Sequence, residues 1–235
     1  MVTGERKLPG SILVAGNASV DEVTNRVGSR KQPGGAAVYA AVAARIFSDE
    51  VKLATAIGGD YEYKGLLRGM FPSSSIFEVK SNSTRFEIRY DGGWNADYRA
   101  VNFGAARLLR ADKVVKAARG SSHVHLAPMS PSKVSSIITK LRREQPDTII
   151  SVNTWEGYMR GRESRELLRE IARGSNFFII NGREITKVTG ISDISWAARQ
   201  LESKQLVVTL GDLGAVYVRE GQLRLIPATV GIAGD

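Results

Sequence analysis

The sequence contains no cysteine, which excludes disulfide bonds and thiolate-bound metals. Histidine is also scarce, with 2 residues in a chain of 235, so a metal site would have to rely mainly on oxygen ligands. No apolar run approaches the roughly 18 residues that a membrane-spanning helix requires. The polar N-terminal stretch "MVTGERKLPG" lacks the apolar core of a secretory signal. We therefore expect no membrane partner and, by default, a cytoplasmic location.

The signatures of two common enzyme classes are missing as well. No G-x-S-x-G occurs, so an α/β-hydrolase nucleophile is not indicated. No G-x-x-x-x-G-K-[ST] occurs, which excludes a P-loop kinase. His123 and His125 alternate on a predicted strand and share a face, but no third metal ligand is evident beside them. We interpret them as strand residues of the core or of the sheet edge.

Length, composition and charge are those of a globular protein with an ordinary core. Hydrophobic residues make up 43% and charged residues 24% of the chain, which is typical of a globular domain. The length allows one sizeable α/β domain with a small appendage. The net charge of +9 would suit either nucleic acid or a small polyanion such as ATP. Since lysine and arginine are spread along the chain, nucleic acid is the less favoured partner.

Apolar, β-branched runs alternate with stretches of helical periodicity. The predicted strands are 11–16, 51–58, 122–128, 148–153, 176–182 and 205–211. The predicted helices are 34–47, 63–71, 130–144, 164–174 and two further ones around Ile185 and Trp196. Strands that are apolar on both faces and separated by helices indicate a parallel sheet covered on both sides. A hairpin over 215–228 is expected to end this series.

Two segments break the alternation and indicate a small additional sheet. Residues 18–33 are polar, and residues 76–102 contain the alternating run "TRFEIRY" and the turn "DGG". We expect a small antiparallel sheet here, used as a lid over a cleft. A patch that forms a homodimer through this lid is the alternative use, and the two uses are compatible.

Polar residues and glycines follow the predicted parallel strands at their carboxyl ends, where ligands bind on open α/β sheets. They are Asn17, Asp21, Asn153, Asn181 and the loop 209–214. The topology would bring them to one edge of the sheet.

In their order, five motifs resemble those of the ribokinase-like (PfkB) carbohydrate kinases over essentially the whole chain. The motifs are "GNASVD" (16–21), "PGGAAVYAA" (33–41), "IGGDYEYKGLL" (57–67), "INGREITKVTG" (180–190) and "VVTLGDLGAV" (207–216). The resemblance implies a single domain over 1–235 with the ribokinase-like three-layer α/β/α fold. It also implies transfer of the γ-phosphoryl group of ATP to a hydroxyl of a sugar, polyol (inositol-like) or nucleoside, with Mg²⁺.

The resemblance assigns an acceptor site to the first two motifs. Asp21 matches the family's substrate carboxylate, which hydrogen-bonds sugar hydroxyls, and Asn17 would assist it. Gly34 and Gly35 would let bare backbone approach the substrate at a helix start. Tyr39 stands where the family usually has a substrate-contacting asparagine, so the acceptor class stays open.

Asn181 and Glu184 match the family's N-x-x-E motif, in which the carboxylate helps to hold hydrated Mg²⁺. The same spacing is that of a helix capping box, and both interpretations can hold together.

The nucleotide loop of the family, T-x-G-x-x-G, is matched by Thr209, Gly211 and Gly214, with a simple glycine turn as the alternative. In "SVNTWEGYMR", Asn153 stands where many relatives have aspartate, and Arg160 would be a second anchor for substrate or phosphate.

The family ends its active site with D-T-x-G-A-G-D, whose last aspartate is the catalytic base. By spacing, Asp235 falls on the first aspartate of that motif. We therefore expect the base and the adenine-binding helices beyond Asp235, while a rival alignment makes Asp235 itself the base. The alternative to a kinase is a non-catalytic or truncated member that binds ligand or nucleotide.

Overall fold

The computed structural model describes residues 10–93 and 96–229 of the chain. They form two compact units. Unit 1 contains the residues up to Pro128 together with Lys140–Thr148, and unit 2 contains Met129–Thr139 and the residues from Ile149 onward. The single domain expected from the sequence stays a prediction. Among the described residues, every helix is too short or too polar to cross a lipid bilayer.

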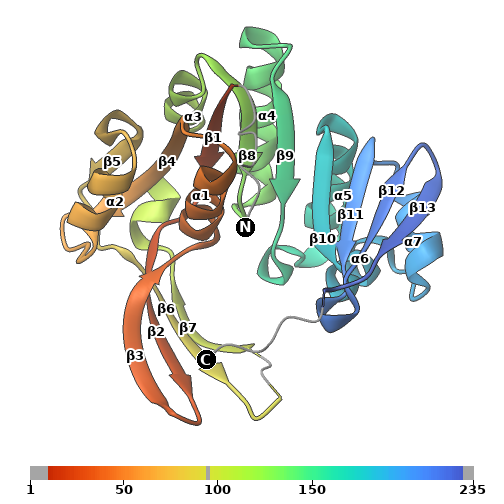
Figure 1. Cartoon of the computed structure of the whole chain (residues 1–235), viewed down its shortest axis with the longest axis horizontal. Coiled ribbons are helices and arrows are strands. Elements are labelled where there is room, and N and C mark those ends of the chain that lie inside the picture. The colour runs from red at the N-terminus through yellow and green to blue at the C-terminus, as the bar shows by residue number, and fades with distance from the viewer. Residues whose placement is uncertain (1–9, 94–95, 230–235) are drawn as a thin grey trace, which may run out of the picture. The chain divides into compact units, whose positions relative to one another are not determined.

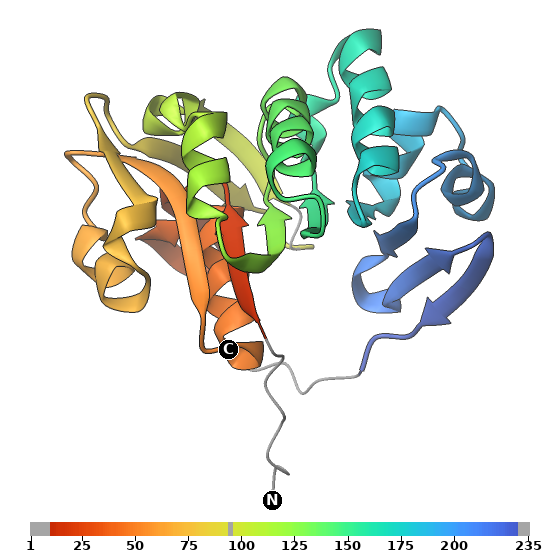
Figure 2. The same cartoon turned by 90° about the horizontal axis from the view of Figure 1, so that it is seen from above.

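Unit 1 contains four parallel strands of the large sheet, in the order β8-β1-β4-β5. Their bounds are β1 Ser11–Ala15, β4 Val51–Gly58, β5 Ile76–Val79 and β8 Ser121–Leu126. The helices are α1 Ala36–Phe47, α2 Lys64–Met70 and α3 Ala111–Ala117, and α4 Pro131–Glu144 contributes to both units. Figure 2 shows α1 on one face of these strands and α3 on the other. These strands are apolar on both faces because helices cover both faces.

The core of unit 1 forms where the small side chains of α1 meet the sheet. Ala37 and Ala41 of α1 are fully buried against Leu53 and Ile57 of β4. Alanine allows a close approach of the helix, which anchors its N-terminus beside the end of β1.

A second, four-stranded sheet has the order β3-β2-β6-β7 and extends from unit 1 (Figure 1). Its strands are β2 Ser19–Asn25, β3 Gly28–Gly34, β6 Thr84–Tyr90 and β7 Ala96–Asn102. This small sheet confirms the predicted appendage, but the prediction of a purely antiparallel sheet is wrong, because β2 and β6 pair in parallel. The strands β1 and β5 end at the same edge of a parallel sheet, so β2 and β6 leave that edge in the same direction.

The lid range predicted from residue 76 begins too early. β5, at Ile76–Val79, pairs in parallel with β4 and belongs to the large sheet. The small sheet resumes only at Thr84. Its use as a lid or as a dimer contact stays a prediction.

Unit 2 contains the other five strands of the large sheet, in the order β13-β12-β11-β10-β9. They are β9 Ile149–Asn153, β10 Phe177–Asn181, β11 Gln205–Thr209, β12 Ala215–Arg219 and β13 Gln222–Ile226. β9, β10 and β11 are parallel, and β12 and β13 form the expected antiparallel hairpin. The helices are α5 Gly161–Gly174, α6 Gly182–Thr189 and α7 Ile194–Gln200. With nine mostly parallel strands, covering helices and a smaller sheet, the three-layer α/β fold class predicted from the sequence is confirmed.

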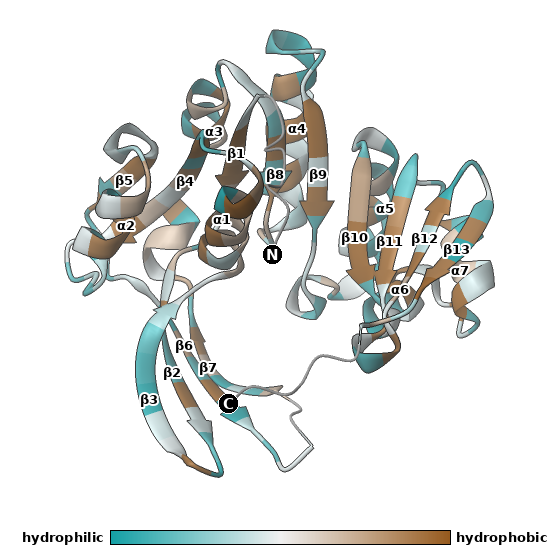
Figure 3. Ribbon diagram, in the orientation of Figure 1, coloured by the Kyte–Doolittle hydropathy of each residue, from teal (hydrophilic) through white to brown (hydrophobic). Residues whose placement is uncertain are grey.

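The core of unit 2 is made by the alternate residues of its strands. Phe178 and Ile180 of β10, Ile150 of β9 and Val208 of β11 are almost completely buried. In Figure 3 these strands are predominantly hydrophobic. The carboxyl ends of β9, β10 and β11 are thereby held in fixed register.

Candidate active site

Asp21 is a buried carboxylate on β2, with 6% of its surface exposed. The hydroxyl of Ser19 donates a hydrogen bond of 2.6 Å to Asp21 Oδ1. Burial raises the pKa of the Asp21 carboxyl, and the hydrogen bond from Ser19 acts in the opposite direction. Burying a carboxylate with a single hydroxyl as its side-chain partner lowers the stability of the fold. Such groups cluster at functional sites, so Asp21 is a strong candidate for ligand binding.

At the two glycine positions predicted for the site, neighbouring protein atoms lie too close to the backbone to leave room for a side chain. The β2–β3 ladder places Ser19 opposite Gly34, and a Cβ atom on Gly34 would overlap with the carboxylate of Asp21. Gly35 has φ of 99° and is the N-cap of α1, and a Cβ there would overlap with the backbone carbonyl of Asn17. The structure therefore brings together Asp21, the glycine pair and the backbone of Asn17 at the start of α1.

Two tyrosines line the surroundings of Asp21. The hydroxyl of Tyr61 donates to the carbonyl of Ser19 at 3.3 Å, and that of Tyr39 donates to the carbonyl of Pro33 at 3.0 Å. Burial, followed by the negative charge of Asp21, raises the pKa of both tyrosines. Tyr39 was expected here, whereas Ser19 and Tyr61 were not identified from the sequence. Ser19 carries a usable signal, because residues two apart on a strand share a face.

In unit 2, the predicted polar residues meet at the carboxyl ends of three neighbouring parallel strands. Asn153 ends β9 and pairs in register with Ile179 of β10, and Asn181, the last residue of β10, pairs with Thr209 of β11. The predicted gathering of these side chains at one sheet edge is confirmed within this unit. We call this edge, with Glu184 and the loop 209–214, the carboxyl edge of unit 2.

Glu184 is buried, with 5% exposure, and both of its oxygens accept backbone hydrogen bonds. It forms a complete capping box with Asn181, as the alternative interpretation predicted. The backbone N–H of Glu184 donates to Asn181 Oδ1 at 2.8 Å, and Glu184 Oε2 accepts from the backbone N–H of Asn181 at 3.0 Å. Its other oxygen accepts from the backbone N–H of Glu156 at 3.1 Å. Burial raises the pKa of the Glu184 carboxyl, and these N–H donors oppose that rise.

Asn153 carries an unsatisfied polar atom at the same edge. Its side-chain Oδ1 is buried and has no hydrogen-bond partner within the part of the chain that the structure describes. Leaving a buried acceptor unpaired costs about 1–3 kcal/mol, so this oxygen is suited to a ligand that brings its own N–H, O–H or bound water.

The loop 209–214 is a closed turn between β11 and β12. Gly211 has φ of 65° and Gly214 has φ of 102°. A Cβ on Gly214 would overlap with the carbonyl of Ile226, whereas Gly211 faces open space and Thr209 is exposed. Packing against Ile226 is thus sufficient to explain why a glycine stands at position 214, while Thr209 and Gly211 are accessible to a ligand.

The remaining predicted residues are less informative. Arg160 is exposed directly before α5. Within the described ranges, no group of three or more histidine, aspartate or glutamate side chains is arranged so that it could hold a metal ion. Asp235 lies outside the described residues.

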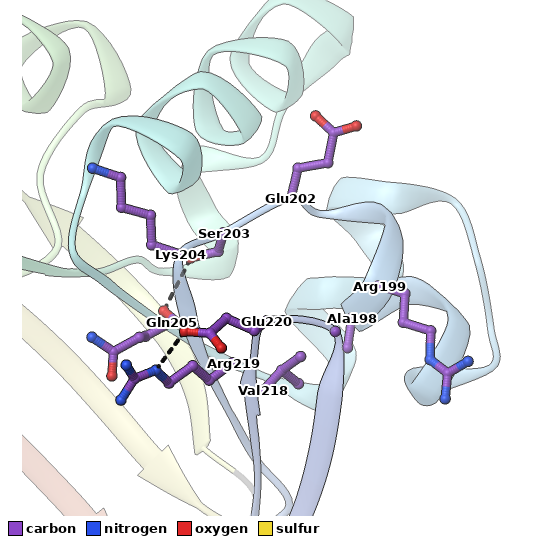
Figure 4. Close-up of a pocket in the computed structure, with 10 residues that line it drawn as sticks. Ala198, Arg199, Glu202, Ser203, Lys204, Gln205, Val218, Arg219 and Glu220 are labelled. Carbon is purple, nitrogen blue, oxygen red and sulfur yellow. Dashed lines mark hydrogen bonds and ion pairs between the residues drawn. The ribbon is translucent and has the colours of Figure 1, made fainter.

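A separate cavity of about 460 Å³ lies at the opposite end of β11 (Figure 4). Gln205, which lines it, begins β11, whereas Thr209 ends the strand. Arg219 and Glu220 on its wall form an ion pair with each other. This cavity is therefore not part of the carboxyl edge.

No protein-family model matches the chain. It is similar to a cytidine kinase of Thermococcus kodakarensis, with 27% identity over 223 residues, 92% of this chain and 78% of that protein.

Two solved structures illustrate the likeness in fold. The nucleoside kinase of Burkholderia thailandensis in complex with inosine has a TM-score of 0.77 at 17% identity, covering 93% of this chain and 76% of that one. A ribokinase of Cryptococcus neoformans in complex with ADP has a TM-score of 0.75 at 19% identity, covering 94% and 79%. The chain therefore has the fold of the ribokinase-type sugar and nucleoside kinases, which confirms the resemblance read from its motifs.

Proposed function

We propose that the protein is an ATP-dependent kinase that transfers the γ-phosphoryl group to a hydroxyl of a sugar, polyol or nucleoside. The observation that carries this proposal is the buried Asp21 carboxylate, packed on Gly34 at the start of α1. The similarity to a cytidine kinase and the fold shared with ribokinases support it.

Asp21 would bind the acceptor. An ionised carboxylate accepts hydrogen bonds from hydroxyl groups, and Ser19 holds Asp21 Oδ1 in a fixed orientation. Gly34 lets the Asp21 carboxylate pack against the backbone of β3, and Gly35 lets the carbonyl of Asn17 approach the start of α1, so the two glycines would fix the geometry of the acceptor site. Phosphoryl transfer depends chiefly on such positioning and on neutralising charge.

The carboxyl edge of unit 2 would bind the nucleotide. Thr209 and Gly211 are accessible and would meet the phosphates or the ribose with a hydroxyl and a backbone N–H. Asn181 stands beside them in the sheet, and exposed Arg160 would be a further phosphate anchor.

Glu184 and Asn153 fit a hydrated Mg²⁺ in their chemistry, since both present the hard oxygen atoms that this ion prefers. The unpaired Oδ1 of Asn153 would accept from a metal-bound water or from a substrate hydroxyl. When bound, Mg²⁺ would neutralise phosphate charge.

The test is consumption of ATP with Mg²⁺ in a screen of sugars, inositols and nucleosides, comparing the wild type with Glu184→Gln. Glutamine can keep the capping box but has no second acceptor oxygen for the backbone N–H of Glu156, so the unfolding free energy should fall by about 1–3 kcal/mol while the protein stays folded. Turnover should nevertheless fall by about 100-fold or more if the charge of Glu184 acts on the metal-bound phosphates. Glu170→Gln, on the exposed face of α5, is the matched control. Wild-type turnover in Glu184→Gln would remove Glu184 from the mechanism.

A non-catalytic role in binding ligand or nucleotide is favoured by one observation. Both oxygens of Glu184 already accept backbone N–H groups, so this residue has a structural role without any metal. Nucleotide binding with no ATP consumption for any acceptor would support this second role over the kinase.

A further inference from the structure

The small sheet places an aromatic residue directly beside the candidate acceptor carboxylate. In the parallel β2–β6 ladder, Asp21 pairs with Phe86. Residues paired in a ladder point to the same face of the sheet, so the Phe86 ring and the Asp21 carboxylate are neighbours there. Phe86 is half-buried, and its ring is held edge-to-face by Tyr98 and Phe103, at centroid distances of 6.1 and 6.0 Å.

A second aromatic ring lies on the other side of Asp21. In the antiparallel β2–β3 ladder Asp21 pairs with Gln32, and Gln32 Nε2 donates to the Tyr39 hydroxyl at 3.2 Å. That hydroxyl also donates to the carbonyl of Pro33. Although its hydroxyl is fixed by these two bonds, Tyr39 keeps 52% of its surface exposed. A rigid ring with half of its surface uncovered offers a preorganised contact for a ligand.

We propose that Phe86 and Tyr39 determine acceptor specificity, by selecting an acceptor whose hydroxylated sugar carries a planar base. This inference rests on the proposed function, with Asp21 as the acceptor-binding carboxylate. The acceptor would place its sugar hydroxyls on Asp21, and its base against one or both aromatic rings. A nucleoside satisfies both contacts, whereas a free sugar or an inositol satisfies only the first.

The replacement of the family's usual asparagine by Tyr39 is consistent with this preference. The hydroxyl of Tyr39 is already engaged by Pro33 and Gln32, so this residue offers a ligand its ring rather than a free hydrogen-bonding group. Stacking tolerates any base, because every base has an aromatic face. The site is therefore expected to distinguish nucleosides from sugars more strongly than one nucleoside from another.

The test is calorimetric titration of the full chain with cytidine and with ribose, which share the sugar ring and differ in the base. The wild type should bind cytidine at least 10-fold more tightly than ribose. Phe86→Leu and Tyr39→Leu should each lower the affinity for cytidine by about 10-fold, the usual order for loss of a base–aromatic stack. The affinity for ribose should change by less than about 3-fold.

Two controls keep the result interpretable. Phe77→Leu removes an aromatic ring from β5 in the large sheet and should change neither affinity. Tyr39→Phe keeps the ring and loses its hydroxyl bonds, so it should retain most of the preference for cytidine even if Tyr39→Leu folds poorly.

The possible failures are distinguishable. Equal affinity of the wild type for cytidine and ribose, or an equal loss of both in the leucine variants, would overturn this inference and leave the proposed function standing. Binding of neither ligand to the wild type would overturn the assignment of Asp21 as an acceptor site, and this inference with it.

Discussion

At the residue scale, Asp21 combines a cost in stability with a candidate role in binding. Its carboxylate is buried beside Ser19 and packed against Gly34. Burial disfavours the charged form, so the pKa of Asp21 in the folded protein lies above its ordinary value. The folded state then binds a proton more readily than the unfolded state, and the stability contribution of Asp21 declines as the pH rises past its ordinary pKa.

We therefore predict that Asp21→Asn stabilises the protein at neutral pH while it weakens acceptor binding. The amide has nearly the same size, can still accept from Ser19 and removes the buried charge. The gain should be about 1 kcal/mol at pH 7, as is usual when a functional site is relieved of strain or charge. It should shrink as the pH falls into the acid range, where Asp21 is protonated in the wild type.

Urea unfolding at neutral and acid pH would measure this difference, with Asp147→Asn, an exposed aspartate before β9, as the matched control. Destabilisation by Asp21→Asn at neutral pH would mean that the ionised carboxylate has favourable partners that outweigh its burial.

The individual site residues differ in how far they could be predicted. Asp21, Gly34 and Gly35 follow from the resemblance, and the overlap that a Cβ would cause explains both glycines. The dual attachment of Glu184 was only half predicted: the capping box is visible in the spacing, but the bond from Glu156 depends on how a distant loop folds. Phe86 could not have been found, since its place beside Asp21 is set by strand register over a long sequence separation.

At the scale of elements, the start of α1 is the feature on which the acceptor site depends. Gly35 has φ of 99° and its missing side chain accommodates the carbonyl of Asn17. An alanine there must adopt a conformation that L-residues avoid and must also displace backbone.

We predict that Gly35→Ala lowers the free energy of unfolding by about 2 kcal/mol or more. Gly65→Ala is the matched control, because Gly65 lies within α2 with open space around it, and alanine there should stabilise by about 0.5–1 kcal/mol. Chemical denaturation of both variants measures the contrast. Equal effects of the two substitutions would show that the start of α1 tolerates a side chain and that the close approach is not required.

Elements with strong apolar patterns were predicted well and the others were not. The strands of the parallel sheet are apolar on both faces, which identifies them without any tertiary information. β5 was assigned to the appendage, because its four residues look the same whether they pair with β4 or with a lid strand. The parallel pairing of β2 with β6 likewise depends on the fact that β1 and β5, which precede them, end at the same edge of the large sheet. The local sequence of β2 and β6 does not encode that arrangement.

At the scale of the whole molecule, the two candidate binding functions lie in different units. The acceptor residues around Asp21 belong to unit 1, and Glu184 with the loop 209–214 belongs to unit 2. The first motifs of the resemblance precede residue 128 and the last ones follow residue 149, so the motifs assigned to the acceptor and those assigned to the nucleotide fall in different units. Each unit should therefore respond to its own ligand.

The most direct measurement is hydrogen–deuterium exchange of the full chain, followed by mass spectrometry, with Mg²⁺–ATP, with cytidine and with neither ligand. We predict that cytidine slows exchange in residues 19–39, around Asp21 and the start of α1. Mg²⁺–ATP should slow exchange in residues 181–184 and 209–214. Unchanged exchange in these segments, or protection by both ligands only elsewhere in the chain, would contradict the assignment of the acceptor and nucleotide sites.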